Sequence, residues 1–324
     1  MERNSWYFSE ESLRRSSPSR LDGIPEDKEK AYRRKTCFYI DETGHAIGMP
    51  KLTVATAHVF FHRFFARQSF KRHDRFLIAA ACLLLAGKVE ESPKKLKDVV
   101  MSSFTVRKRN AAVSLDQTNQ EYAEHKEKIL MCERILLHTI GFDMCIEHPY
   151  KYLIEICKEL KKQRIIGNND GSGRDFAQTA LNFVNDSMRT SLCLQFPPAK
   201  VAAAAVFLAT LFREIRPEKR MGPRWVQLLM VGRAAGSAHP TPQEQATFEN
   251  DLHAICKQIM ELYQSTKSDK HRETFRRMAQ ELNLHHPHPP APPVMGSPPG
   301  GGSLGGEGEG DRDRGREFGN LLFA

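Results

Sequence analysis

The chain has 324 residues, a formal net charge of +9 and an apolar content of 40%. This length allows two domains that each bury a core of their own. No apolar run approaches the roughly 20 residues needed to cross a bilayer, and the opening sequence, MERNSWYFSEESLRRSSPSR, lacks the apolar centre of a signal peptide. These features argue against a membrane protein, and we expect the chain to remain inside the cell.

Seven cysteines are scattered along the chain without any C-x-x-C pair, the spacing typical of zinc and redox sites. Most of them fall in apolar helical patterns, so we expect small buried side chains in a reducing compartment. Three histidines near the end, His285, His286 and His288, lie in a proline-rich stretch that is more typical of solvated side chains than of metal ligands. We therefore predict no metal site and no cofactor.

Taken in chain order, residues 1–25 are polar and predict an arm, followed by a helix that begins near Glu26 or Asp27. From there to about residue 264, apolar side chains recur every three or four positions, as in LTVATAHVFFHRFF and HKEKILMCERILLHTI. Strand-like alternation is nearly absent, and Gly- and Pro-containing breaks divide this part into about ten helices. We predict an all-α fold followed by a Pro-, Gly- and His-biased tail that is disordered.

The helical part of the sequence repeats itself at a shift of 123 residues without a gap. IAAACLLLA (78–86) falls on VAAAAVFLA (201–209), and ATAHVFF (55–61) falls on QTALNFV (178–184). The same shift places Ile129, Cys132, Leu136 and Leu137 on Leu252, Ile255, Ile259 and Met260. We therefore predict a duplicated five-helix domain, with an alanine-rich helix at the centre of each copy.

Two charged residues break this internal symmetry. Lys88 corresponds to Leu211, and Glu133 corresponds to Cys256, so each charge stands where the other copy is apolar. A charge removed from water costs several kcal/mol unless it has a partner. Three interpretations stay open: the two residues pair inside the first copy, they are ordinary surface residues, or they lie in an apolar surface that a second protein covers.

The sequence contains no motif of an enzyme active site. A nucleophile elbow, a P-loop, a Gly-rich kinase loop and an H-E-x-x-H pair are all missing from the helical part. We therefore expect a binding protein rather than an enzyme.

Several stretches resemble the cyclin family: HRFF (62–65), LAGKVEESPKKLKDVV (85–100), CERILLHTIGFD (132–143) and EHPYKYL (147–153). The arm WYFSEESLRRSSPSRLDGI (6–24) and FVNDSMRTSLCLQFPP (183–198) are similar to the transcriptional cyclins T and K, and within them to plant-type cyclin T. The resemblance implies an N-terminal arm (1–25), a first cyclin box (26–146), a second cyclin box (147–265) and a tail (266–324).

For cyclins, the family implies a regulatory subunit without catalytic residues that forms a heterodimer with a cyclin-dependent kinase through its first box. For the T and K type it further implies a nuclear complex that phosphorylates the carboxy-terminal repeats of RNA polymerase II during transcript elongation. One departure is AYRRKTCFYIDETG (31–44), which lacks the M-R-A-I-L docking motif of cell-cycle cyclins. The positions that match the family's kinase-binding residues are Lys88, Val89, Glu90, Glu133, Leu137 and Phe142.

A basic stretch supports an alternative function. Residues 67–110 contain eleven Lys or Arg against four Asp or Glu, a local balance of +7. Such a stretch suits acidic partners, and a solvated basic face explains it equally well. The alternative is a general transcription factor of the same fold, resembling TFIIB, that binds DNA or RNA by phosphate contacts. No zinc ribbon precedes the helices, and RNA stays a candidate partner of a cyclin as well.

Overall fold

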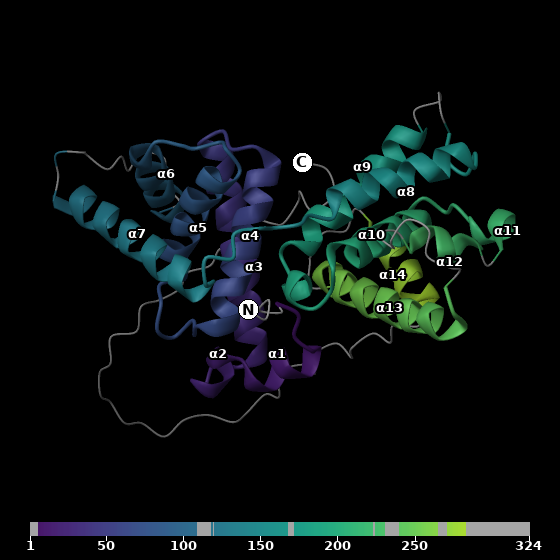
Figure 1. The fold of residues 1–324 in the computed structure, drawn as a ribbon, viewed down its shortest axis with the longest axis horizontal. Coiled ribbons are helices and arrows are strands. Elements are labelled where there is room, and N and C mark those ends of the chain that lie inside the picture. Colours follow the sequence, from purple (N-terminus) through teal and green to yellow (C-terminus); the bar gives the residue numbers. More distant parts are fainter. Residues whose placement is uncertain are drawn as a thin grey trace, which may run out of the picture.

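The computed structural model describes residues 6–108, 118, 120–167, 172–222, 224–230, 240–264 and 271–282. Every regular element in these ranges is a helix, which confirms the predicted all-α class. None of the helices in this part of the chain is long and apolar enough to cross a membrane. Figure 1 shows two groups of helices side by side, with the short helices of the arm below the junction between them.

The first group of helices surrounds α5 (Arg75–Val89). Asp74 begins this helix, because its carboxylate accepts hydrogen bonds from the backbone N–H groups of Phe76 and Leu77. Residues 78–87 are all buried, and their small alanines let the neighbouring helices approach α5 closely. The neighbours are α3 (Glu26–Ala46), α4 (Lys51–Arg67), α6 (Leu96–Lys108) and α7 (Gln120–Thr139).

The second group surrounds α10 (Pro198–Phe212), which is equally rich in buried alanine. A shift of 123 residues places both ends of α5 on both ends of α10, so the predicted duplication is confirmed. The other members are α8 (Tyr150–Lys162), α9 (Ser172–Ser187), the 3-10 helix η1 (Ser191–Leu194), α11 (Glu218–Met221), α12 (Arg224–Leu229) and α13 (Pro242–Gln264).

The duplication extends to the backbone of the turn that follows each central helix. The Ser92 N–H donates to the Gly87 carbonyl at 2.9 Å, and the Ile215 N–H donates to the Thr210 carbonyl at 2.9 Å, 123 residues later. Glu91 and Glu214, also 123 residues apart, both have a positive φ, of 50° and 57°. Since this conformation is uncommon for residues with a side chain, its recurrence indicates that both repeats end the helix in the same way.

The arm is more ordered than its polar sequence suggests. It forms α1 (Glu10–Ser16) and α2 (Pro18–Leu21), each capped by the hydroxyl of the preceding serine. Trp6 is buried, with the guanidinium groups of Arg63 and Arg67 over its ring at 4.8 and 4.0 Å. Its indole N–H donates to Asp143 at 2.8 Å, and the Phe8 N–H donates to the Leu194 carbonyl at 2.7 Å. The arm therefore contacts both repeats.

The sequence assigns residues 266–324 to the tail, but the structure shows a helix inside that range. Helix α14 (Arg272–Glu281) packs on α10 and α13, and Met278, Ala279 and Leu282 are buried in the second core. These apolar residues are spaced by one to four positions and form one helical face, which offsets the entropy of ordering the segment. The histidines at 285, 286 and 288 lie outside the described residues.

The cysteines only partly match the prediction of small buried residues. Cys37, Cys82, Cys157 and Cys256 are buried, whereas Cys145 is exposed. Cys145 follows α7 in the segment between the two repeats, outside any helix.

Candidate partner-binding surface

Lys88, near the end of α5, and Glu133, in the second half of α7, form an ion pair. The Lys88 ammonium donates to both carboxylate oxygens of Glu133, at 2.8 and 2.9 Å. The lysine side chain is 53% exposed and the glutamate only 10%. Helix α7 places Glu133 among its buried positions beside α5, and the end of α5 brings Lys88 across to it. The carboxylate therefore has the partner that its burial requires.

This geometry answers part of the question raised by the sequence. The two residues pair within the first repeat, as one of the three interpretations holds. The pair nevertheless lies at the protein surface, because half of the Lys88 side chain remains in contact with solvent. An internal ion pair and a surface that a partner covers are therefore compatible in this fold.

The neighbouring residues on α5 have different roles. Val89 is half-buried and packs against the first core. Glu90 ends α5, where its backbone N–H donates to the Ala86 carbonyl. Its carboxylate accepts a 2.7 Å hydrogen bond from the Thr56 hydroxyl of α4, which holds the end of α5 against its neighbour.

Leu137 and Phe142 continue the surface along α7. Leu137 is half-buried against the same core as Val89. Phe142 lies just beyond the helix with 57% of its surface exposed, and its φ of 57° falls in the left-handed region. Its backbone N–H donates to the Leu137 carbonyl at 3.0 Å. An exposed aromatic ring on a residue with an uncommon backbone conformation makes Phe142 a candidate for a functional role. We call the six residues Lys88, Val89, Glu90, Glu133, Leu137 and Phe142 the docking surface.

The sequence did not single out the outer face of α7, which borders the docking surface. Met131 is 57% exposed there, and with Arg134 and His138 it lines a shallow hollow of about 380 Å³. The His138 ring contacts the Phe142 ring edge-on at 5.6 Å between centroids. Met131, Arg134 and His138 are three, four and seven positions apart, a spacing that places them on one face of a helix and could have indicated this face from the sequence.

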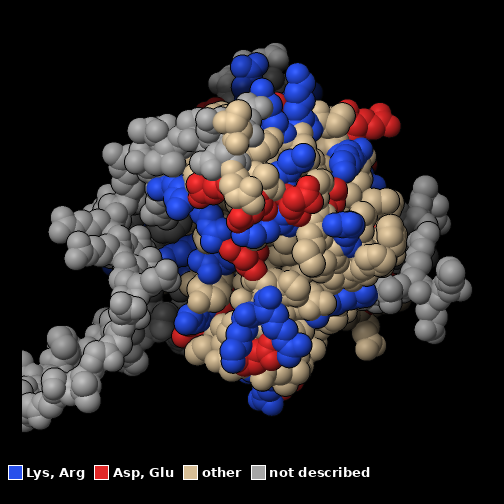
Figure 2. Space-filling model, turned by 90° about the vertical axis from the view of Figure 1, so that its left-hand side faces the viewer, with Lys and Arg blue, Asp and Glu red and all other residues tan. Residues whose placement is uncertain are grey.

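Among the described residues 67–108, basic side chains are interspersed with acidic ones. Figure 2 shows Lys and Arg mixed with Asp and Glu over the face of the first repeat. Arg72 pairs with Asp22, and Arg107 pairs with Asp74. The guanidinium group of Arg75 lies 4.3 Å from the centroid of the Tyr32 ring. Arg72, Arg75 and Arg107 thus have partners within the fold, which weakens the expectation of a site for nucleic acid.

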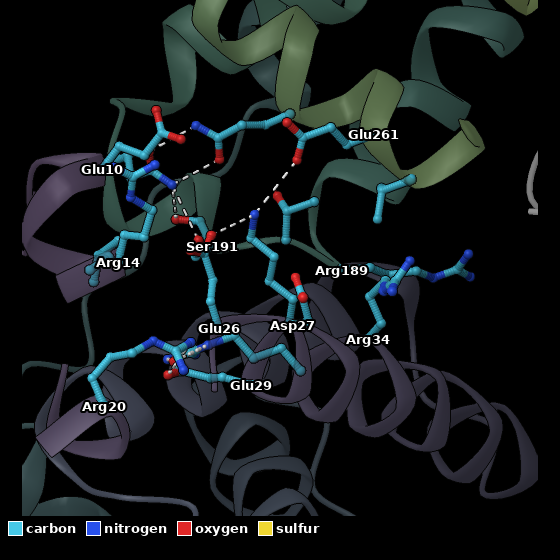
Figure 3. A pocket seen from close by; sticks show the side chains of 17 residues that line it. Glu10, Arg14, Arg20, Glu26, Asp27, Glu29, Arg34, Arg189, Ser191 and Glu261 are labelled. Atoms are coloured by element: carbon cyan, nitrogen blue, oxygen red, sulfur yellow. Dashed lines mark hydrogen bonds and ion pairs between the residues drawn. The ribbon is translucent and has the colours of Figure 1, made fainter. Parts of the chain in front are cut away.

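A second hollow, of about 260 Å³, lies where the arm, α3 and the second repeat meet (Figure 3). Charges of opposite sign face each other around it. Arg33 donates to Glu29 at 2.8 and 3.0 Å, and Lys30 binds Glu26 at 2.9 Å and Glu261 of α13 at 3.7 Å. Because these charges compensate one another, we interpret this hollow as part of the junction between the repeats.

Comparisons with known proteins agree with this fold. The family model described as "Cyclin, N-terminal domain" matches residues 4–145. The chain is 40% identical to Cyclin-T1-3 of Oryza sativa subsp. japonica, over 81% of this chain and 49% of the relative. It is 34% identical to Cyclin-K of Homo sapiens, over 86% of this chain and 44% of the relative. It is 38% identical to Putative cyclin-T1-1 of Arabidopsis thaliana, over 64% of this chain and 79% of the relative. The chain thus spans about half the length of the rice and human relatives.

A solved structure with a similar fold is the yeast RNA Pol II CTD kinase CTDK-1 complex. The TM-score is 0.61 at 17% identity, with 89% of this chain and 86% of the other covered. The CAK complex of Chaetomium thermophilum bound to ATP-gamma-S gives a TM-score of 0.58 at 17% identity, over 86% and 85% of the two chains. Sequence and fold together establish that the chain belongs to the cyclin family, and within it to the transcriptional cyclins of the T and K type.

Proposed function

We propose that the chain is the non-catalytic regulatory subunit of a cyclin-dependent serine/threonine kinase, and that the kinase binds the docking surface. The observation that carries this proposal is the ion pair of Lys88 and Glu133 beside the exposed ring of Phe142. A binding hot spot is a small group of anchor residues ringed by contacts that exclude water, and this ion pair with the Phe142 ring and the half-buried Val89 and Leu137 offers such a group. The second repeat has Leu211 and Cys256 in place of the charges, so the equivalent positions of that repeat cannot form this ion pair.

The names of the similar proteins support the same partner class. The relatives in sequence are cyclins, one solved structure of similar fold is named as a kinase complex, and another is named as the CAK complex bound to ATP-gamma-S. The two solved structures are only 17% identical to the chain, so they support the fold alone. The proposal of a docking surface therefore depends on the residues described above.

Activation follows from binding alone in this proposal. A protein kinase transfers phosphate only when the Lys of strand β3 pairs with the Glu of helix αC. A subunit that binds the inward position of αC more tightly than the outward one shifts the kinase toward the active state. Each 1.4 kcal/mol of such preference changes the ratio of the two states about tenfold.

The substrate and the compartment are the finer part of the proposal. We infer that the complex acts in the nucleus on the carboxy-terminal repeats of RNA polymerase II. The T and K type of the chain and its similarity in fold to a yeast CTD kinase complex favour this substrate. The test is phosphorylation of a peptide of those repeats by the complex purified from nuclei, with a histone peptide as the comparison.

A charge exchange at the docking surface tests kinase binding. In Lys88→Glu combined with Glu133→Lys the ion pair can re-form, so we expect nearly unchanged helical content and melting. The exchanged charges face the partner with the wrong sign, and we expect co-purification of the kinase to fall at least tenfold.

The second repeat offers a matched control. Lys200 pairs with Asp251 between α10 and α13, the counterparts of α5 and α7. The exchange Lys200→Asp with Asp251→Lys should leave kinase binding unchanged. Full binding by the first exchange would instead assign Lys88 and Glu133 to internal structure alone.

A further inference from the structure

The second repeat carries a face equivalent to the docking surface, and α14 lies on it. Shifting the docking surface by 123 residues gives Leu211 for Lys88, Phe212 for Val89, Cys256 for Glu133 and Met260 for Leu137. Helix α14 packs on α10 and α13, the two helices that carry these residues (Figure 1).

The contacts of α14 fall on the equivalent positions themselves. Arg277 donates to the backbone carbonyl of Leu211 at 3.5 Å. The Phe275 ring lies 5.9 Å from the Phe212 ring, the counterpart of Val89. Arg277 also pairs with Glu214, the residue of the turn whose left-handed backbone both repeats share. Helix α14 therefore binds the second repeat at the end of its central helix.

The chemistry of this face explains why an amphipathic helix fits it. Cys256 and Met260 are fully buried, and Met278 of α14 and Leu282, which follows it, belong to the same apolar cluster. At the rim, Arg216 donates to both carboxylate oxygens of Glu281 at 2.7 and 2.9 Å. An apolar centre with charge-paired edges is the arrangement of a groove that receives a helix.

We propose that the second repeat has a helix-binding groove at the end of α10 and α13, and that α14 is the resident ligand of this groove. Because α14 occupies the groove, the first repeat is left as the face on which a kinase docks. The claim about the first repeat rests on the proposed function, whereas the claim of a groove in the second repeat does not. A partner that binds the second repeat here must be an amphipathic helix and must displace α14.

The test uses the full chain and a labelled peptide of residues 271–282. The variant Met278→Asp with Leu282→Asp puts carboxylates against the apolar groove, which should release α14 while the groove stays intact. We expect the peptide to bind this variant at least tenfold more tightly than the wild-type chain. A peptide carrying Met278→Asp should not bind either chain.

Two results would overturn the proposal. One is a folded variant that binds the peptide no better than the wild type does. The other is loss of amide protection throughout α10 and α13 in the variant, because α14 would then be an inseparable part of the core. A milder variant guards against simple misfolding: Arg277→Glu should speed hydrogen exchange across 272–282, and adding Glu214→Arg should restore protection. Equal exchange in all three chains would contradict the proposal.

The role in kinase docking is measured separately, by native mass spectrometry of the complex. We expect one kinase per wild-type chain, bound at the first repeat and lost on the exchange of Lys88 and Glu133. Two kinases on the wild-type chain would refute the claim that α14 leaves only one face. No kinase at all would refute the proposed function, while the peptide experiment would still report on the groove.

Discussion

Lys88 neutralises a glutamate that can hardly reach water by itself, since only 10% of the Glu133 side chain is exposed. Lys88→Glu alone would place two carboxylates side by side. We expect the free energy of unfolding to fall by about 1–2 kcal/mol, between the values typical of exposed and of buried ion pairs. Urea unfolding measures this, and adding Glu133→Gln should recover most of the loss. An unchanged midpoint for Lys88→Glu would mean that the pair contributes nothing to stability.

Phe142 combines an exposed ring with a φ of 57°, a conformation that costs a residue with an ordinary side chain about 1 kcal/mol. Asparagine tolerates this conformation and is polar. We therefore expect Phe142→Asn to melt at or slightly above the wild-type temperature while kinase affinity falls at least tenfold. Leu21→Asn, at an exposed apolar residue of the arm, is the control and should change neither quantity. A clear loss of stability in Phe142→Asn would assign the ring to the fold.

For individual residues, the sequence predicts which side chains belong to the docking surface better than it predicts how those side chains are arranged. The duplication alone singles out Lys88 and Glu133, because the second repeat has apolar residues at the equivalent positions. Their mutual pairing is one of three interpretations of the sequence, and it could not be chosen over the others because it depends on where α7 crosses α5. The left-handed backbone of Phe142 leaves no trace in the sequence either, because glycine or asparagine would be its usual sign.

Close packing of the first repeat depends on one glycine of α3. A Cβ atom on Gly44 would lie 2.7 Å from Cγ2 of Val54 on α4 and 3.4 Å from Leu83 on α5. Alanine favours a helix by about 1 kcal/mol over glycine, but overpacking a core costs about 1–3 kcal/mol. Because Val54 is β-branched and stiff, we expect Gly44→Ala to destabilise the chain by about 1 kcal/mol in urea unfolding. His45→Ala, at the exposed neighbouring position, should have little effect, and a more stable Gly44→Ala would contradict this packing.

The packed helices among the described residues extend to α14 (Arg272–Glu281), beyond the predicted start of the tail at residue 266. A chain that ends at Leu282 should melt like the full chain and activate the kinase on a short peptide equally well. A chain that ends at Gln264 loses the buried Met278 and Leu282, and each such side chain stabilises by about 1.5–3 kcal/mol. We expect its free energy of unfolding to fall by several kcal/mol while the remaining helices stay formed. Equal melting of both truncated chains would contradict the packing of α14.

The helices themselves could be predicted because each central one is a run of small apolar residues bounded by clear signals, Asp74 for α5 and Pro198 for α10. Helix α14 was missed because RETFRRMAQE is mostly polar, and because it adjoins a sequence rich in proline and glycine. Its three apolar residues, Phe275, Met278 and Ala279, can be recognised as a buried face only once the groove that receives them is known.

The junction between the repeats joins residues far apart in sequence, so no local pattern could predict it. His62 of α4 lies 2.9 Å from the Met188 carbonyl through Nε2 and 3.2 Å from Arg33 through Nδ1. Burial lowers the pKa of His62 well below its usual value, and the charge of Arg33 adds to this effect. The folded chain therefore holds the ring in its neutral form. Below about pH 6.5 the unfolded chain binds a proton that the folded chain does not, so the free energy of unfolding decreases as the pH falls further.

Asp186 makes the opposite contribution at the same junction. It accepts a 2.5 Å hydrogen bond from Tyr263 and lies 3.1 Å from Arg189, which also binds Asp41 of α3 at 3.1 Å. Burial raises the pKa of Asp186 to about 7, although Arg189 and Tyr263 lower it and Asp41 raises it further. Between pH 4 and 7 the folded chain thus holds a proton that the unfolded chain has released, so stability falls as the pH rises through this range. We expect the stability of the wild type relative to Asp186→Asn to decrease from pH 5 to pH 8 in urea unfolding, with Asp251→Asn as the control. A constant or increasing difference would show that Asp186 is ionised in the folded chain.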